Sequence, residues 1–401
     1  MKVLRYVLKW VVLSTLVAGL AGSASAAFLF LLDWATQTRE AHRELVWGLP
    51  FIGFVVGWVY WRFGRSVEAG NNLLIDEIHD PRQVVPLRMA PLVLLSTVLS
   101  HLFGASVGRE GTAVQMGGAL SDQLTHVFRL RREDRRLILM AGISAGFASV
   151  FGTPLAGAVF GLEVLALGRL RYDALLPCTV AAVVADQVAA AWGIAHTHYA
   201  VSVMSALSVS SMLAVAAAGA LFGLAGRAFA RGAHALSGAM RQHVTYPPLR
   251  PFVGGLVLVA CLMGLGAWRY AGLGVPVMVE AFAKPVPMWD FLAKGVLTVL
   301  SIGTGFKGGE VTPLFFIGAT LGNALSAVLH QPLGMMAALG FVGVFAGAAN
   351  TPLACTLMAM ELFGADIGVY ALLACVCSYL CSGHTGIYKA QRVDHRKWSG
   401  Q

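Results

Sequence analysis

Two glutamates, Glu110 and Glu310, stand at glycine-rich turns that precede apolar runs: GASVGREGTAVQMGGAL from Gly104 and GFKGGEVTPLFF from Gly305. A glycine-rich turn that opens a helix presents free backbone N–H groups, and the helix dipole adds positive potential there. Such a turn binds an anion without a full positive charge, and a carboxylate at its mouth competes with the anion until it is protonated. The pattern predicts a site where protonation of Glu110 controls anion exchange. The alternative is that Glu110 only caps its own helix.

The two turns belong to a longer internal repeat. They match at an offset of 200 residues: Gly108 with Gly308, Glu110 with Glu310, and Thr112 with Thr312. In a second pair, Thr-Pro-Leu-Ala is followed by six residues and a glutamate, from Thr153 to Glu163 and from Thr351 to Glu361. Two matches in the same order indicate duplication. The alternative to a functional role for Lys307 and Glu310 is that they form an ion pair with each other.

The composition predicts a polytopic helical membrane protein. Of 401 residues, 57% are hydrophobic, mean hydropathy is +0.71, and the charged fraction of 12% is about half that of a soluble domain. Apolar runs follow one another from Leu8 to Cys381, and backbone polar groups in lipid are satisfied within helices. The basic residues behind the net charge of +9 gather in connectors and at the termini, which indicates membrane orientation rather than nucleic-acid binding. The six cysteines all lie in apolar segments and are interpreted as core residues.

Charge asymmetry predicts two antiparallel halves, residues 1–200 and 201–388, with a short basic cytoplasmic tail at 389–401. Both termini are basic and are expected in the cytoplasm, whereas the junction Gly193–Val203 contains no lysine or arginine and is expected outside. The first helix of the second half, about Ala206–Gly226, is followed by arginines, unlike the first helix of the first half. For the N-terminus we expect a first transmembrane helix rather than a signal peptide cleaved after Ala24–Ala26.

Several apolar segments are too short or too interrupted to span a bilayer, and they recur in both halves: Leu92–Phe103, Thr112–Leu124, Leu137–Phe151 and Gly334–Phe345. Irregular backbone at membrane depth is tolerated where it lines a cavity. The expected fold class is therefore all-α: two inverted-topology repeats with broken and re-entrant helices that meet at a mid-membrane anion site. This is a transporter architecture.

Other candidate chemistry is weaker. Asn71 and Asn72 precede an apolar helix, which they would cap unless they contact an anion. Gly142–Gly146 matches G-x-S-x-G, but a nucleophile elbow needs a preceding strand and the surroundings are helical, so a membrane-embedded hydrolase is disfavoured. His196 and His198 lie in a polar connector and are expected to be solvated. No enzyme activity, cofactor or metal site is predicted.

The ordered motifs resemble the CLC family of anion channels and proton-coupled antiporters over about residues 50 to 390. They are GREG at Gly108–Gly111, FRLRREDRR, AGFASVFGTPLAG, GGEVTP and the late Gly386–Tyr388. Four departures from the chloride-handling members are informative. GNNLL from Gly70 replaces Gly-Ser-Gly-Ile-Pro, and Thr112 replaces a proline. Val311-Thr312, preceded by Glu310, replaces a Phe-Ala pair, and Val164 replaces an internal proton glutamate. These features are similar to the fluoride/proton antiporter branch.

The resemblance implies a role for each matching residue. Glu110 would be the gating, proton-carrying glutamate, and Glu310 would take part in coupling. The expected anion-lining positions are Asn71, Gly108, Arg109, Gly111, Thr112, Val311, Thr312 and Tyr388. Fluoride fits these donors because it is strongly hydrated and accepts hydrogen bonds avidly. The expected protein is a homodimer of the cell inner (plasma) membrane that exports fluoride in exchange for protons and confers fluoride resistance; the alternatives are a chloride/proton antiporter and a passive anion channel.

Overall fold

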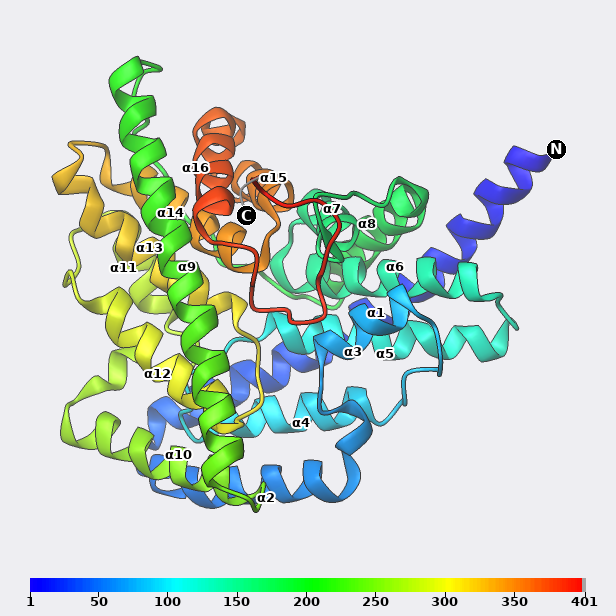
Figure 1. The fold of residues 1–401 in the computed structure, drawn as a ribbon, viewed down its shortest axis with the longest axis horizontal. Helices are drawn as coiled ribbons and strands as arrows, with labels where there is room; N and C mark the ends of the chain where they lie inside the picture. The colour runs from blue at the N-terminus through cyan, green and yellow to red at the C-terminus, as the bar shows by residue number, and fades with distance from the viewer. Residues whose placement is uncertain (399–401) are drawn as a thin grey trace.

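The computed structural model describes residues 1–398, which form an all-α fold apart from one pair of two-residue strands (Figure 1). The first-half α-helices are α1 (Lys2–Ala41), α2 (Leu49–Phe63), α3 (Asn71–His79), α4 (Met89–Leu102), α5 (Glu110–Val127), α6 (Arg132–Phe151), α7 (Pro154–Glu163) and α8 (Leu175–Ala191). Those of the second half are α9 (Val209–His243), α10 (Leu249–Val259), α11 (Val275–Ala283), α12 (Asp290–Thr304), α13 (Val311–Val328), α14 (Leu333–Ala349), α15 (Pro352–Phe363) and α16 (Gly368–Cys381). Short helical turns are η1 (Arg43–Gly48), η2 (Arg65–Val67), η3 (Tyr172–Ala174), η4 (Ala260–Gly264), η5 (Ala267–Tyr270) and η6 (Ala365–Ile367).

The order of helix lengths recurs in the two halves. Helices α5 and α13 both have 18 residues, α3 and α11 both have 9, and the longest helices, α1 and α9, open each half with 40 and 35 residues. Within residues 1–398, five helical segments are long and apolar enough to cross a membrane, among them α1, α9 and α13. The α13 segment differs from the rest because 78% of it is buried within the protein, against at most 50% for the others. Helix α13 is therefore a central helix rather than a lipid-facing one.

Helix α9 is longer than the sequence predicted. It runs to His243 instead of ending near Gly226, so Arg227, Arg231 and Arg241 lie on the helix and not after it. It begins where the Ser208 side chain accepts a hydrogen bond from the backbone of Ser211 at 3.1 Å. It continues because it packs against α16, α14 and α12 along its length, as the long green helix in Figure 1 shows.

The expectation for the N-terminus agrees with the structure, since Ala24–Ala26 lies in the middle of an unbroken α1.

Close glycine contacts hold the central helices together. Helix α5 packs on α6 with Gly117 against the backbone of Gly142, and α13 packs on α14 with Gly318 against the backbone of Gly340. A Cβ at Gly318 would collide with the Gly340 carbonyl. Small residues allow this close approach in membrane helix pairs. The G-x-S-x-G stretch from Gly142 lies inside α6, so its glycine serves helix packing rather than a strand-to-helix elbow.

Two glutamates explain the second repeated motif. Glu163, at the end of α7, accepts hydrogen bonds from the first backbone N–H groups of α15, those of Leu353 at 3.0 Å and Ala354 at 2.8 Å. Glu361 on α15 does the same for α7, at Leu155 (2.8 Å) and Ala156 (2.9 Å). Each half thus caps a helix of the other half, and negative charge at a helix N-terminus is stabilising.

The C-terminal segment folds back across the first half. Strand β2 (Arg392–Val393) pairs in parallel with β1 (Ala166–Leu167), which follows α7. In Figure 1 this red segment passes between α16 and the α3–α7 region. The predicted tail, residues 389–401, is therefore packed on the protein as far as Trp398, and its last three residues lie outside the described part of the chain.

Candidate functional site

The two glycine turns meet, although 200 residues separate them in the sequence. The Gly108 N–H donates to the Gly309 carbonyl at 2.5 Å, and the Gly309 N–H donates to the Gly108 carbonyl at 2.7 Å. Residue Gly309 tolerates no side chain here, because a Cβ would lie 2.7 Å from the Gly111 nitrogen. The N-termini of α5 and α13 are thereby fixed against each other in the interior. Their free N–H groups and dipoles create positive potential at one place.

The Glu110 carboxylate occupies this place. It is fully buried and accepts hydrogen bonds from the Thr312 backbone N–H at 3.0 Å and the Thr312 hydroxyl at 2.6 Å. Arg109 contributes its Nε at 3.3 Å, and its side chain is 22% exposed. Although Glu110 is the first residue of α5, its carboxylate binds the N-terminus of α13 in the other half. The alternative that it only caps its own helix does not describe this contact.

Glu310 and Asn71 lie beside Gly111. A Cβ placed on Gly111 would be 3.2 Å from Asn71 Nδ2 and 3.7 Å from Glu310 Oε2. Asn71 begins α3, so a third helix N-terminus points at the same region. Its Oδ1 is buried and has no hydrogen-bond partner among the described residues. The Glu310 carboxylate and the Asn71 amide are therefore neighbours at Gly111, while the Glu110 carboxylate is bound to Thr312.

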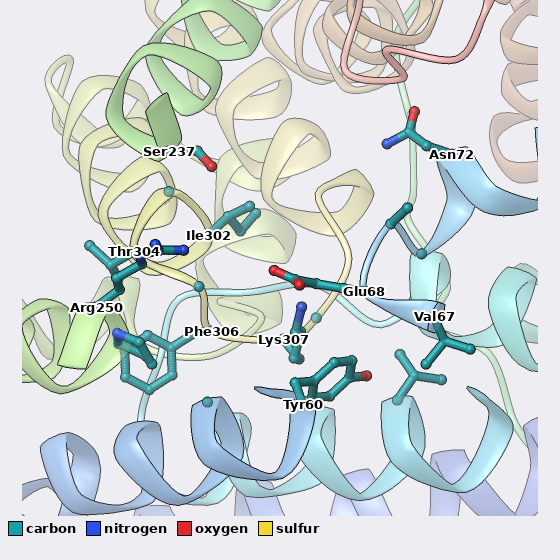
Figure 2. A pocket seen from close by; sticks show the side chains of 18 of the residues that line it. Tyr60, Val67, Glu68, Asn72, Ser237, Arg250, Ile302, Thr304, Phe306 and Lys307 are labelled. Atoms are coloured by element: carbon teal, nitrogen blue, oxygen red, sulfur yellow. The ribbon is translucent and has the colours of Figure 1, made fainter. Parts of the chain in front are cut away.

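A cavity of about 540 Å³ opens from Glu310 and Asn71 and is also lined by Tyr388. Basic and polar side chains surround it, including Arg241, Arg250, Ser237 and Gln115. Figure 2 shows Lys307 in this cavity between the Tyr60 ring and the Glu68 carboxylate. The Lys307 Nζ lies 4.1 Å from the centre of that ring.

The suggested ion pair between Lys307 and Glu310 is not formed. No contact within 4.0 Å joins the two charged groups, although both are described. The ring of Tyr60 provides a cation–π contact in its place. The ammonium group therefore contributes positive charge to the cavity that leads to Asn71.

A second, much smaller cavity, about 20 Å³, lies at Glu110 and Thr312. It is lined by Arg109 and by residues of the connector between the halves, His196 and Tyr199 among them. Glu110 thus borders this cavity, whereas Glu310 borders the large one.

The remaining predicted positions differ in where their side chains point. Tyr388 is 6% exposed and faces the large cavity with Asn71. Val311 is the buried first residue of α13. The Thr112 hydroxyl pairs with the Thr97 hydroxyl of α4 at 2.7 Å. Only the backbone of Thr112 is then available to the anion turn.

Sequence reasoning left the role of Asn72 open and placed His196 in solvent. The Asn72 Oδ1 accepts the backbone N–H of Ala390 at 2.9 Å, so this residue holds the C-terminal segment and not the anion turn. His198 is exposed as expected, but His196 is half-buried and reaches the small cavity. The one feature of the sequence that goes with the burial of His196 is that its segment, which also holds Tyr199, contains no lysine or arginine.

Comparison with known proteins identifies relatives over nearly the whole chain. The family model described as voltage gated chloride channel matches residues 52–383. A chloride/fluoride channel protein of Pseudomonas syringae pv. tomato is 64% identical over 400 residues, which are 98% of this chain and 88% of that protein.

Two solved structures resemble the fold closely. A CLC-type fluoride/proton antiporter superposes with a TM-score of 0.94 at 34% identity, covering 96% of this chain and 98% of its own. A slow cyanobacterial Cl⁻/H⁺ antiporter has a TM-score of 0.83 at 20% identity, covering 94% and 96%, a level of identity that supports the fold alone.

Proposed function

The chain belongs to the CLC family of voltage gated chloride channels, and we propose that it is an antiporter that exports fluoride from the cell in exchange for protons. Two relatives support this substrate: one is named a chloride/fluoride channel protein, and the other is a CLC-type fluoride/proton antiporter of nearly identical fold. In this proposal the basic termini and the large cavity face the cytoplasm, and the connector between the halves faces outward.

The observation that carries the proposal is the position of the Glu110 carboxylate. It fills the N-terminus of α13, where the Thr312 N–H and hydroxyl would otherwise be free to bind an anion. Protonation removes its negative charge and weakens both hydrogen bonds, since bonds to a charged acceptor are roughly twice as strong as neutral ones. The carboxyl group then leaves, fluoride replaces it, and one residue couples the two ions.

The polar groups around this position support fluoride as the anion. Fluoride is smaller and more strongly hydrated than chloride, so its water must be replaced by strong hydrogen-bond donors. The Thr312 hydroxyl, the Asn71 amide and the α13 N–H groups are such donors. In the proposal Arg109, Gly108, Gly111, Thr112 and Val311 contribute backbone to the path and Tyr388 lines its inner end.

Glu310 is proposed as the second proton-coupling group. It lines the large cavity, whereas Glu110 lines the small one, and its carboxylate lies beside Gly111. Val164 supplies no carboxylate at the position of the internal glutamate of chloride antiporters, so another acid must take up the proton. Glu310 and Glu68 both line the cavity, and Glu310 is the one of the two whose carboxylate lies with Asn71 beside Gly111.

Two further proposals concern organisation. The meeting of two glycine turns and the reciprocal Glu163 and Glu361 caps support a division into inverted halves at about residue 200. A homodimer in the inner membrane, with one pathway in each subunit, is proposed from the family resemblance. Cross-linking and mass measurement in detergent would test the dimer.

A fluoride-electrode assay on the purified protein in liposomes tests the function. With fluoride loaded inside, an inward proton gradient should accelerate fluoride efflux, and a fluoride gradient should in turn move protons. Chloride/proton exchange is the second candidate, since the Pseudomonas relative is named for both halides. A preference for chloride would favour this candidate, and fluoride flux without any proton movement would indicate a passive channel.

A further inference from the structure

The connector between the halves, residues 193–208, is largely exposed but packs on the protein at His196 and Tyr199. We name it the outer strap. Its Tyr199 ring packs beside Phe282 and Phe341, with ring centres 5.1 and 5.2 Å away. These phenylalanines belong to α11 and α14 of the second half. The outer strap is therefore anchored beside the small cavity at Glu110.

Three residues of the outer strap, His196, Thr197 and Tyr199, line this cavity together with Glu110, and His196 is the one with an imidazole. Its ring packs directly over Gly152, where a Cβ would lie 2.5 Å from the imidazole Cδ2. Gly152 has a φ of 70°, so both its conformation and the ring above it favour glycine. The Nε2 atom of His196 is buried and has no hydrogen-bond partner among the described residues. A buried polar atom without a partner is uncommon and calls for a functional or solvent contact.

The cavity that joins His196 to Glu110 has the volume of about one water molecule. It measures about 20 Å³, and a cavity needs roughly 10–15 Å³ to hold one water. A buried water also needs two to four polar partners. The lining offers them in His196, Glu110, Thr312 and Arg109.

We propose that His196 relays protons between the outer solution and Glu110 through one water molecule in this cavity. The inference rests on the proposed proton-coupled exchange and adds its outer proton port. In the inward step, an external acid gives a proton to a ring nitrogen of His196. The imidazolium passes a proton to the bridging water, which passes one to the Glu110 carboxylate. The ring returns to its neutral form, and one proton has moved without electron transfer.

The charges around His196 decide when the relay operates. Burial, and then the positive charge of Arg109, lower the pKa of His196 below its usual 6.5, and His198 acts in the same direction more weakly. Asp186 on α8 and a hydrogen bond to the Val150 carbonyl of α6 act to raise its pKa. Glu110 faces the ring across the cavity. The net lowering leaves His196 neutral near neutral pH and lets it accept protons as the outside becomes acidic.

Tyr199 does not replace His196 as the carrier. Burial raises the pKa of its hydroxyl to about 12, so it stays protonated over the working range of pH. Acid is also the condition in which hydrogen fluoride enters cells. The relay would then work fastest when fluoride export is needed most.

The test measures fluoride and proton flux in liposomes while the external pH is stepped from about 7.5 to about 5.5, on either side of the ordinary histidine pKa. For His196→Gln we expect the acid-stimulated flux of both ions to fall by about tenfold, a modest effect for loss of a proton-transfer group. The matched control is His198→Gln, which changes the exposed histidine of the same strap and should behave as wild type. External imidazole should restore flux to His196→Ala and leave wild type unchanged.

The outcomes separate the relay from the transport function. If wild type moves fluoride without protons, the proposed function fails and the relay with it. If wild type exchanges the two ions and His196→Gln matches it within twofold at every external pH, the relay alone is wrong. If the alanine variant does not fold, the glutamine variant decides, because it keeps a polar side chain over Gly152.

Discussion

The Glu110→Gln substitution removes the charge and the exchangeable proton of the proposed gate while keeping its size. In the structure the carboxylate accepts two hydrogen bonds from Thr312, at 3.0 Å from the backbone and 2.6 Å from the hydroxyl. A hydrogen bond to a charged group contributes about 1.5–3 kcal/mol, and a neutral one about 1 kcal/mol. Two such bonds therefore weaken by about 1–4 kcal/mol in total when the acceptor becomes an amide.

This energy converts into occupancy of the gate position. Each 1.4 kcal/mol is tenfold, so the balance between the bound and displaced side chain shifts by about 5- to 700-fold. Fluoride then meets less competition at the α13 N-terminus, and its equilibrium affinity should rise or stay equal. Proton-driven fluoride flux should fall to the background of empty liposomes, because glutamine carries no proton.

Isothermal titration with fluoride and the liposome flux assay measure the two effects on the same preparation. Glu361→Gln is the matched control, since it makes the same chemical change at a carboxylate that caps α7 outside the pathway. Proton-coupled flux within twofold of wild type in Glu110→Gln would refute the gate role. A loss of fluoride binding along with flux would instead mean that the carboxylate holds the site together.

Three further substitutions test other parts of the structure. Lys307→Met should raise the half-saturating cytoplasmic fluoride concentration by about tenfold with little change in maximal rate. The reason is that one positive charge in the large cavity attracts fluoride by roughly 1–4 kcal/mol at a surface-like dielectric constant. An unchanged half-saturating concentration would exclude this residue from fluoride capture. Gly318→Ala should destabilise the protein by about 1–3 kcal/mol, because the added methyl group overpacks the contact with Gly340. Gly238→Ala, where a Cβ meets nothing within 4 Å, should instead stabilise the exposed helix by up to about 1 kcal/mol. Thermal unfolding of the two variants in detergent measures this difference. Glu163→Gln should lower the free energy of unfolding by about 1–2 kcal/mol, because the cap of α15 is weakened, and should leave the fluoride-to-proton ratio of transport unchanged. A changed ratio would mean that Glu163 carries protons, against the capping role that its hydrogen bonds indicate.

The local motifs were readable because each depends on its immediate neighbours. Hydropathy determined the membrane class, since lipid requires helices that satisfy their own backbone. The glycine turns predicted helix N-termini at Glu110 and Glu310, and the structure begins α5 at Glu110 and α13 just after Glu310. The length of α9 was misjudged, because its end depends on packing against α12, α14 and α16 and not on hydropathy.

The sequence predicted that the halves meet at the anion site, but the individual side-chain contacts between them were outside its reach. The matching Thr-Pro-Leu-Ala and glutamate motifs showed a duplication, but only the packing of α7 on α15 made Glu163 and Glu361 reciprocal caps. Lys307 seemed a partner for Glu310 because they are neighbours in sequence, yet the turn directs its ammonium to Tyr60 instead. Side-chain direction at a glycine turn depends on backbone angles that composition does not specify.

The sequence by itself determined the class of protein, the repeated glycine turns and the presence of a carboxylate at each, because these are properties of short segments. Tertiary structure alone decided that Glu110 binds Thr312, 202 residues away, and that His196 reaches the same cavity. The physical reason is that a buried carboxylate takes the nearest unsatisfied N–H groups, and which groups are nearest depends on how the helices pack.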